Sequence, residues 1–152
     1  MRTAERVVPA ENLAIAGLVP LSAVDWPGRL VATVFCQGCP LRCPYCQNSS
    51  ILDPTVPGAV PWGDVEDLLS RRRGLLDGVV FTGGEALRQE AVISAAEEVA
   101  ELGFEVGVHT SGMFPDRLER MMHVVDWVGL DVKARPEDYK KAVGVRGDKV
   151  WR

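Results

Sequence analysis

The segment LVATVFCQGCPLRCPYCQN, residues 30–48, joins two patterns that together decide the fold. Its first part, residues 30–35, is a short run of apolar and β-branched residues, which is typical of a buried β-strand. The second part contains all four cysteines of the chain, which are Cys36, Cys39, Cys43 and Cys46. The segment therefore predicts a core strand whose carboxyl end leads directly into a cysteine-rich loop.

Strands of the same kind recur along the chain, and helical patterns separate them. Beside residues 30–35, strands are predicted near 13–18, 79–81, 104–108 and 124–134, and helices at 64–73, 88–103, 115–123 and 136–144. Such alternation predicts a parallel sheet with right-handed crossovers. We therefore expect an α/β fold, a partial (βα) barrel of parallel strands.

Length and composition indicate a single domain. The chain has 152 residues, of which 47% are hydrophobic and 25% are charged, as in ordinary globular proteins. We expect one domain over residues 1–152, with about the first 12 residues as a flexible tail. Because the chain stops at DKVWR, where another helix and strand would follow, we expect a barrel truncated at its carboxyl end, with later βα units missing.

Charge and hydropathy argue against two classes of partner. A net charge of −4 does not favour nucleic acid, and no apolar run reaches the ~18 residues that span a bilayer. The apolar run at 13–24 has the look of an export signal, but Glu5 and Glu11 precede it and Pro20 interrupts it. A reducing cytoplasm is the expected compartment.

The cysteine loop is compatible with several kinds of site. Disulfides are disfavoured, since a chain of this length needs no covalent support and the bridges would close very short loops. Structural zinc sites usually place a dozen or more residues between two Cys-x-x-Cys pairs, whereas three residues separate Cys39 from Cys43. An iron–sulfur cluster suits the density better, held either by four thiolates or by three. Because Cys36 ends an apolar strand, we expect its thiol to be buried outside the cluster.

Unusual polar residues also follow the other predicted strands. In parallel α/β folds, chemistry collects where strands end. Here the strand ends read TGGE at 82–85, HTSG at 109–112 and DVK at 131–133. Asp131 and Lys133 alternate around one residue, so both side chains are expected on the same face of their strand end. These strand ends and the cysteine loop predict one shared site.

The cysteine spacing Cys39-x₃-Cys43-x₂-Cys46, with Tyr45 before the last cysteine, resembles the signature of the radical S-adenosylmethionine enzymes. The segments at 25–35 and 71–87 resemble the branch of glycyl-radical activases that acts on anaerobic ribonucleoside-triphosphate reductase. The nearest alternatives are an activase of the formate-lyase type, and a non-catalytic Cys₄ iron–sulfur or zinc module.

This resemblance implies a mechanism and partners. One [4Fe–4S] cluster would be held by Cys39, Cys43 and Cys46, and S-adenosylmethionine would bind its open iron. Reduced flavodoxin or ferredoxin would supply the electron. The protein substrate would be the anaerobic reductase, on which a glycyl radical would be generated.

The resemblance also implies residues that bind S-adenosylmethionine. Its methionine amino group would be held by the GGE motif, Gly83, Gly84 and Glu85. Its adenine would lie beside Tyr45, with backbone contacts from Cys46 and Gln47.

The remaining expected contacts are to the ribose and the methionine carboxylate. Asp131 and Lys133 resemble the Asp-x-Lys pair that makes such contacts in the family. Where related activases carry aspartate, this chain has His109, which when neutral accepts through one nitrogen only. We therefore expect ribose contact to pass to Ser111 and leave the role of His109 open.

Overall fold

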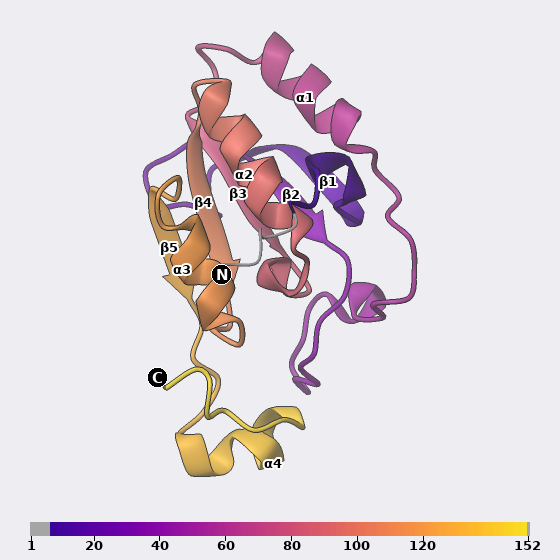
Figure 1. Cartoon of the computed structure of the whole chain (residues 1–152), viewed down its shortest axis with the longest axis vertical. Helices are drawn as coiled ribbons and strands as arrows, with labels where there is room; N and C mark the ends of the chain where they lie inside the picture. The colour runs from indigo at the N-terminus through magenta and orange to yellow at the C-terminus, as the bar shows by residue number, and fades with distance from the viewer. Residues whose placement is uncertain (1–6, 152) are drawn as a thin grey trace, which may run out of the picture.

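In the described part of the chain, five β-strands form a single sheet in which their order across the sheet is their order along the chain. The computed structural model describes residues 7–151. The strands are β1 (Ile15–Ser22), β2 (Val31–Cys36), β3 (Gly78–Gly83), β4 (Glu105–Thr110) and β5 (Trp127–Leu130). Strands β2 to β5 are parallel, and all four end at the same edge of the sheet (Figure 1). The α/β class and the mainly parallel sheet are confirmed.

The first strand differs from the expected parallel arrangement. β1 runs antiparallel to β2, with Ile15 opposite Cys36 and Ser22 opposite Val31. The connection between them, residues 23–30, contains no helix, and a short connection joins antiparallel strands rather than parallel ones. β1 is therefore an antiparallel strand at the edge of an otherwise parallel sheet.

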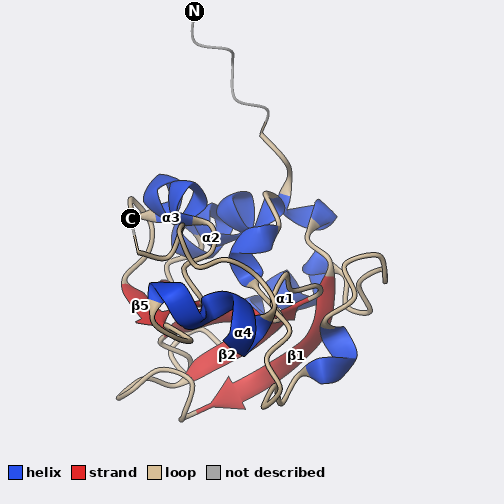
Figure 2. Cartoon of the chain, turned by 90° about the horizontal axis from the view of Figure 1, so that it is seen from below, coloured by secondary structure: helices blue, strands red, loops and turns tan. Residues whose placement is uncertain are grey.

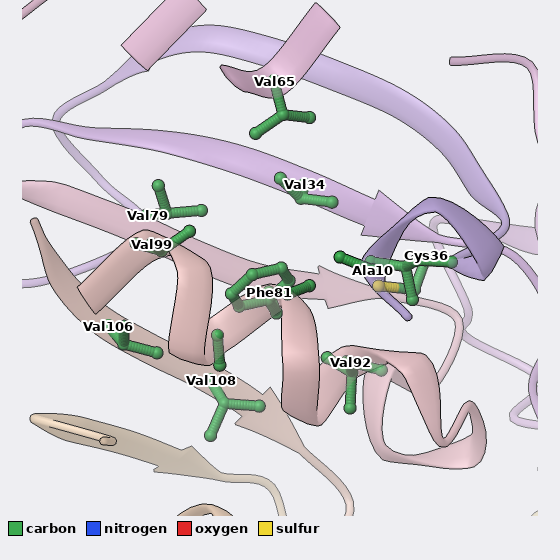
Figure 3. Packing of buried hydrophobic residues seen from close by; sticks show 14 of the residues in the cluster. Ala10, Val34, Cys36, Val65, Val79, Phe81, Val92, Val99, Val106 and Val108 are labelled. Atoms are coloured by element: carbon green, nitrogen blue, oxygen red, sulfur yellow. The ribbon is translucent and has the colours of Figure 1, made fainter. Parts of the chain in front are cut away.

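Three helices cover one face of the sheet, namely α1 (Trp62–Arg71), α2 (Ala91–Glu101) and α3 (Pro115–Met121) (Figure 2). Every second strand residue points into the core beneath them, because side chains alternate across a strand. Val34, Phe81 and Val108 are such residues and are fully buried (Figure 3). This alternation fixes which side chains face the helices and which face the open side of the sheet.

The open face is covered in part by an aromatic pair. Trp26, from the β1–β2 connection, stacks on Trp127 of β5 with ring centroids 5.5 Å apart. Trp26 also lies against Gly107 of β4, where an added Cβ would come within 2.8 Å of the indole ring. The pair therefore packs against the central strands on this face of the sheet.

Two terminal segments depart from expectation. The short 3-10 helix η1 (Ala10–Asn12) packs on the core and Ala10 is fully buried, so this part of the expected tail is ordered; residues 1–6 lie outside the described residues. At the other end, β5 stops at Leu130, shorter than the strand predicted at 124–134. The chain then forms η4 (Pro136–Asp138) and α4 (Tyr139–Val143), which lie beyond the strand ends (Figure 1).

No helix formed by residues 7–151 has the length and apolar character needed to cross a bilayer.

Candidate active site

A pocket of about 490 Å³ opens at the carboxyl ends of the parallel strands. Its walls come from the cysteine loop, from residues of β3, β4 and β5, and from the segments that follow these strands. Every residue predicted to bind the cluster or S-adenosylmethionine lines it: Cys39, Cys43, Tyr45, Cys46, Gln47, Gly83, Gly84, Glu85, Ser111, Asp131 and Lys133. The structure thus brings together residues that lie as much as 94 positions apart in the chain.

The fourth cysteine is separate from this pocket. Cys36 is fully buried at the end of β2, inside the core that Ala10 helps to form (Figure 3). Burial raises the pKa of its thiol to about 12, since the thiolate would lose its hydration there. Cys36 is therefore the buried strand-end residue that the sequence predicts, and it remains protonated at neutral pH.

The three pocket cysteines are partly buried and free of disulfides. Burial also raises the pKa of Cys39, to about 11, and that of Cys43. Thiols must lose their protons to bind iron, so cluster assembly here would release protons. Within residues 7–151 no three or more His, Cys, Asp or Glu side chains converge closely enough to hold one metal ion.

The donor set suits an iron–sulfur cluster. Three cysteines line one pocket, and soft sulfur ligands are the ones that such clusters use. The pocket leaves space beside these thiols for a group larger than a single ion. Because the Cys36 thiol is enclosed in the core, three cysteines rather than four are available to a cluster.

The two glycines of the GGE motif are required by the cysteine loop. A Cβ added to Gly83 would lie 2.3 Å from the backbone nitrogen of Cys36, and one added to Gly84 would lie 2.3 Å from the carbonyl oxygen of Gly38. The amide of Gly84 donates to the Cys36 carbonyl at 3.0 Å, and that of Glu85 donates to the Gly38 carbonyl at 2.9 Å. The backbone of these glycines was expected to approach a ligand closely, but in the structure it approaches the backbone of Cys36 and Gly38 closely. Both glycines also line the pocket.

Glu85 is held by four donors. One carboxylate oxygen accepts from the Thr110 hydroxyl at 2.8 Å and the Leu87 amide at 3.1 Å. The other accepts from Ser111 twice, from its amide at 2.9 Å and its hydroxyl at 2.6 Å. With 2% exposure and both oxygens engaged, the carboxylate joins the end of β3 to the end of β4. Its expected contact with an ammonium group stays a prediction.

Ser111 and His109 have defined hydrogen-bonding states. The Ser111 hydroxyl gives its proton to Glu85, so toward a ribose hydroxyl it can only accept. His109 Nε2 lies 2.7 Å from the Asp25 carbonyl oxygen, and because a carbonyl only accepts, Nε2 carries a proton. The rings of His109 and Trp127 pack edge to face with their centroids 5.2 Å apart, and both residues line the pocket.

Tyr45, Asp131 and Lys133 form a second group on the pocket wall. Lys133 pairs with Asp131, and its ammonium nitrogen lies 5.6 Å from the centroid of the Tyr45 ring. Burial lowers the pKa of Lys133, but the hydrogen bond and charge of Asp131 outweigh burial and leave it raised. The two charged residues follow β5 rather than extend it, and their side chains pair directly with each other.

Two pocket residues and one residue that supports the cysteine loop were missed from the sequence. Asn48 donates to the Gly83 carbonyl at 3.2 Å and so ties the far end of the cysteine loop to the GGE motif. Gln89 donates to the carbonyl of Gln37 at 3.0 Å and supports the near end of the loop. Trp127 also lines the pocket. An aromatic residue in a strand usually indicates core packing, and nothing in the local sequence distinguishes this one.

Comparison with known proteins reveals related sequences. The family model described as Radical SAM superfamily matches residues 33–152. A glycyl-radical enzyme activating enzyme of Methanocaldococcus jannaschii is 34% identical over 140 residues, which cover 88% of this chain and 56% of that protein. The pyruvate formate-lyase-activating enzyme of Clostridium pasteurianum is 30% identical over 138 residues, covering 88% and 58%. The chain thus spans somewhat more than half the length of these two relatives.

Relatives with another name also match. The 7-carboxy-7-deazaguanine synthase of Hyperthermus butylicus is 31% identical over 163 aligned positions, covering 94% of this chain and 67% of that protein. The family model covers well over half of the chain, and it includes the cysteine loop and all the strand ends that line the pocket. The chain therefore belongs to the radical SAM superfamily of enzymes, whose members use a [4Fe–4S] cluster and S-adenosylmethionine.

Proposed function

We propose that this chain is the catalytic core of a glycyl-radical activase. Cys39, Cys43 and Cys46 would hold the cluster, and the adjoining pocket would bind S-adenosylmethionine. The observation that carries the proposal is the convergence of all the expected site residues, from four separate strand ends, on one pocket of about 490 Å³.

When bound, the cluster supplies one electron that cleaves S-adenosylmethionine into methionine and a 5′-deoxyadenosyl radical. The protein's own residues bind and orient. Tyr45, which is 61% exposed, offers a ring face for the adenine, and Lys133 offers a cation for the methionine carboxylate. Gly83 and Gly84, which line the pocket and carry no side chain, would present backbone groups to the methionine amino group.

Ribose recognition is proposed for the end of β4. Ser111 would accept a hydrogen bond from a ribose hydroxyl, since its own proton is engaged by Glu85. Asp131, which is exposed and lines the pocket, would supply a further acceptor. Both roles use the ability of these side-chain oxygens to accept further hydrogen bonds.

The protein substrate we propose is anaerobic ribonucleoside-triphosphate reductase, and the electron donor is reduced flavodoxin or ferredoxin. The sequence resemblance at 25–35 and 71–87 supports the reductase, whereas the relatives' names support glycyl-radical enzymes more broadly. We place the protein in a reducing cytoplasm, in keeping with four free cysteines.

The test begins with anaerobic reconstitution of the chain with iron and sulfide. Addition of dithionite and S-adenosylmethionine should yield 5′-deoxyadenosine, and a Cys43→Ala variant should yield none. Absence of the product from a chain that carries a complete cluster would overturn the proposal.

The protein substrate is then identified by electron paramagnetic resonance. A glycyl radical should form on the anaerobic reductase and not on pyruvate formate-lyase. A signal on formate-lyase alone would reassign the partner. Turnover of a small-molecule substrate without any protein radical would favour the chemistry that the name of the Hyperthermus butylicus relative denotes.

A further inference from the structure

Charge is distributed unevenly along the chain. Residues 7–132 contain eight Lys or Arg and seventeen Asp or Glu, a net charge of −9. Residues 133–151 contain six Lys or Arg and three Asp or Glu, a net charge of +3. A basic segment thus follows β5 in a chain whose described remainder is strongly acidic.

This basic segment packs on the cysteine loop. Tyr139 and Val143 of α4 are fully buried and form a small apolar cluster with Leu41, against which Cys39 and Cys43 pack. The amide of Arg42 donates to the Val143 carbonyl at 2.9 Å. Figure 2 shows α4 lying across the edge at which the parallel strands end. The loop is therefore enclosed between the pocket on one side and α4 on another.

The pocket and the α4 surface do not overlap. Among the described residues, none beyond Lys133 lines the pocket. A molecule that covers α4 can therefore contact the cysteine loop without filling the space proposed for S-adenosylmethionine and the substrate. Electron delivery needs such a second approach, because the donor must act while the pocket is occupied.

The cations on this surface are available to a partner. Lys140 and Lys141 are exposed, and neither has an ion-pair partner among residues 7–151. Arg42, on the cysteine loop itself, is also exposed and forms no salt bridge within that range, although its charge helps to lower the pKa of Asp53. Exposed cations usually do no more than interact with water. Here, however, Lys140 and Lys141 belong to the helix that packs on the cysteine loop, and Arg42 belongs to the loop itself.

We propose that Arg42, Lys140 and Lys141 form a docking surface for an acidic one-electron donor protein of the flavodoxin type. The inference rests on the proposed function, because only a redox cluster in the loop needs such a donor. The donor loses one electron and the cluster gains it, so charge balances without a further reactant. The acidic remainder of the surface repels an acidic donor, and the basic surface attracts it to the loop.

The test compares the rates at which the clusters of charge variants are reduced. Each rate is measured by stopped flow as the loss of visible absorbance. With flavodoxin hydroquinone at low salt, a Lys140→Glu/Lys141→Glu variant should be reduced about tenfold more slowly than wild type. A Lys140→Gln/Lys141→Gln variant should be intermediate, and a Lys140→Arg/Lys141→Arg variant should match wild type. The wild-type reduction rate should decrease as the salt concentration is raised from about 10 to about 200 mM. The rate of the glutamate variant should change little over the same range.

Two controls separate docking from other effects. An Arg71→Glu/Arg72→Glu variant carries the same change of charge at the end of α1, at the opposite end of the molecule from α4 (Figure 1), and should keep the wild-type rate. Reduction by dithionite, which needs no protein surface, should differ less than twofold among all variants. The rate constants for association of oxidised flavodoxin with the cluster-free chains, measured by surface plasmon resonance, should rank the variants in the same order as the reduction rates.

A wild-type rate for the Lys140→Glu/Lys141→Glu variant, or an equal slowing of the Arg71→Glu/Arg72→Glu control, would overturn the docking surface. The predicted order of rates without any 5′-deoxyadenosine would support docking and overturn the proposed function alone. Failure of the wild-type chain to assemble a cluster would overturn both.

Discussion

Glu85 at the end of β3 accepts two hydrogen bonds from Ser111 at the end of β4, one from its amide at 2.9 Å and one from its hydroxyl at 2.6 Å. The two residues lie 26 positions apart in the chain. Their contact connects the GGE motif with the strand end proposed to bind ribose, and it is enclosed, with Glu85 2% exposed.

Substitution Glu85→Gln should destabilise the fold by about 2–3 kcal/mol. The amide group of glutamine would face two donors with a donor of its own, and a buried hydrogen bond would be lost. Urea denaturation of the cluster-free chain measures the change. The matched change Glu101→Gln, on the exposed last turn of α2, should shift the free energy of unfolding by less than about 0.5 kcal/mol. Equal stabilities for the two variants would contradict this account of Glu85.

Substitution Gly84→Ala should prevent normal assembly of the cysteine loop. The added methyl group would lie 2.3 Å from the Gly38 carbonyl oxygen, a backbone atom that cannot move without displacing Cys39. We expect the reconstituted variant to bind less than a tenth of the wild-type iron. Gly63→Ala is the matched control, because an added Cβ there meets nothing within 4 Å and lies in α1, where alanine should stabilise by about 0.5–1 kcal/mol. A full complement of iron in Gly84→Ala would refute the argument.

Substitution Cys36→Ala should leave the cluster intact. Its thiol is buried in the core, so removal should cost about 1 kcal/mol of packing and no iron. Cys39→Ala, Cys43→Ala and Cys46→Ala should each lose the cluster. Iron content and visible absorbance after anaerobic reconstitution measure the outcome. Loss of the cluster in Cys36→Ala would show that four cysteines bind iron and would favour an electron carrier.

The buried Cys36 thiol should also make stability depend on alkaline pH. Its pKa is raised from 9.0 in the unfolded chain to about 12 in the fold, so above pH 9 the unfolded chain releases a proton that the folded chain retains. The contribution is fully present below pH 9 and is lost as pH rises from about 9 to about 12. Loss of this contribution should make the free energy of unfolding about 1.4 kcal/mol lower at pH 10 than at pH 8. Because other groups titrate too, the measured quantity is the difference between wild type and Cys36→Ala; an equal pH dependence would contradict it.

The fold was predictable where local sequence determines structure. Runs of β-branched residues placed β2 to β4 within a few residues of their observed bounds, and the apolar spacing placed α2. The direction of β1 was not predictable, because the same apolar pattern suits parallel and antiparallel pairing. The end of β5 at Leu130 was also not predictable from the sequence. Val132 continues the apolar pattern of the strand, but in the structure it lies after the strand and is exposed.

The members of the site were predictable in advance, but their interactions with one another were not. Cysteine spacing and the strand-end motifs identified residues that the fold gathers around one pocket. What Gly84 and Glu85 contact depends on partners at Gly38 and Ser111, which no local pattern connects with them. Likewise, α4 was expected as a helical turn, but its position on Leu41 is set by tertiary packing.

The hydrogen bonds from Gly84 and Glu85 to the carbonyls of Cys36 and Gly38 carry the β2–β3 pairing beyond the sheet and into the cysteine loop. The loop thereby acquires part of the rigidity of the core, and much of the entropy cost of ordering it is met during folding rather than during metal binding. Slow hydrogen exchange at these two amides in the cluster-free chain would mark the loop as preorganised. A loop already shaped before iron arrives can favour assembly of the same cluster each time over the many other ways in which three thiols can bind metal.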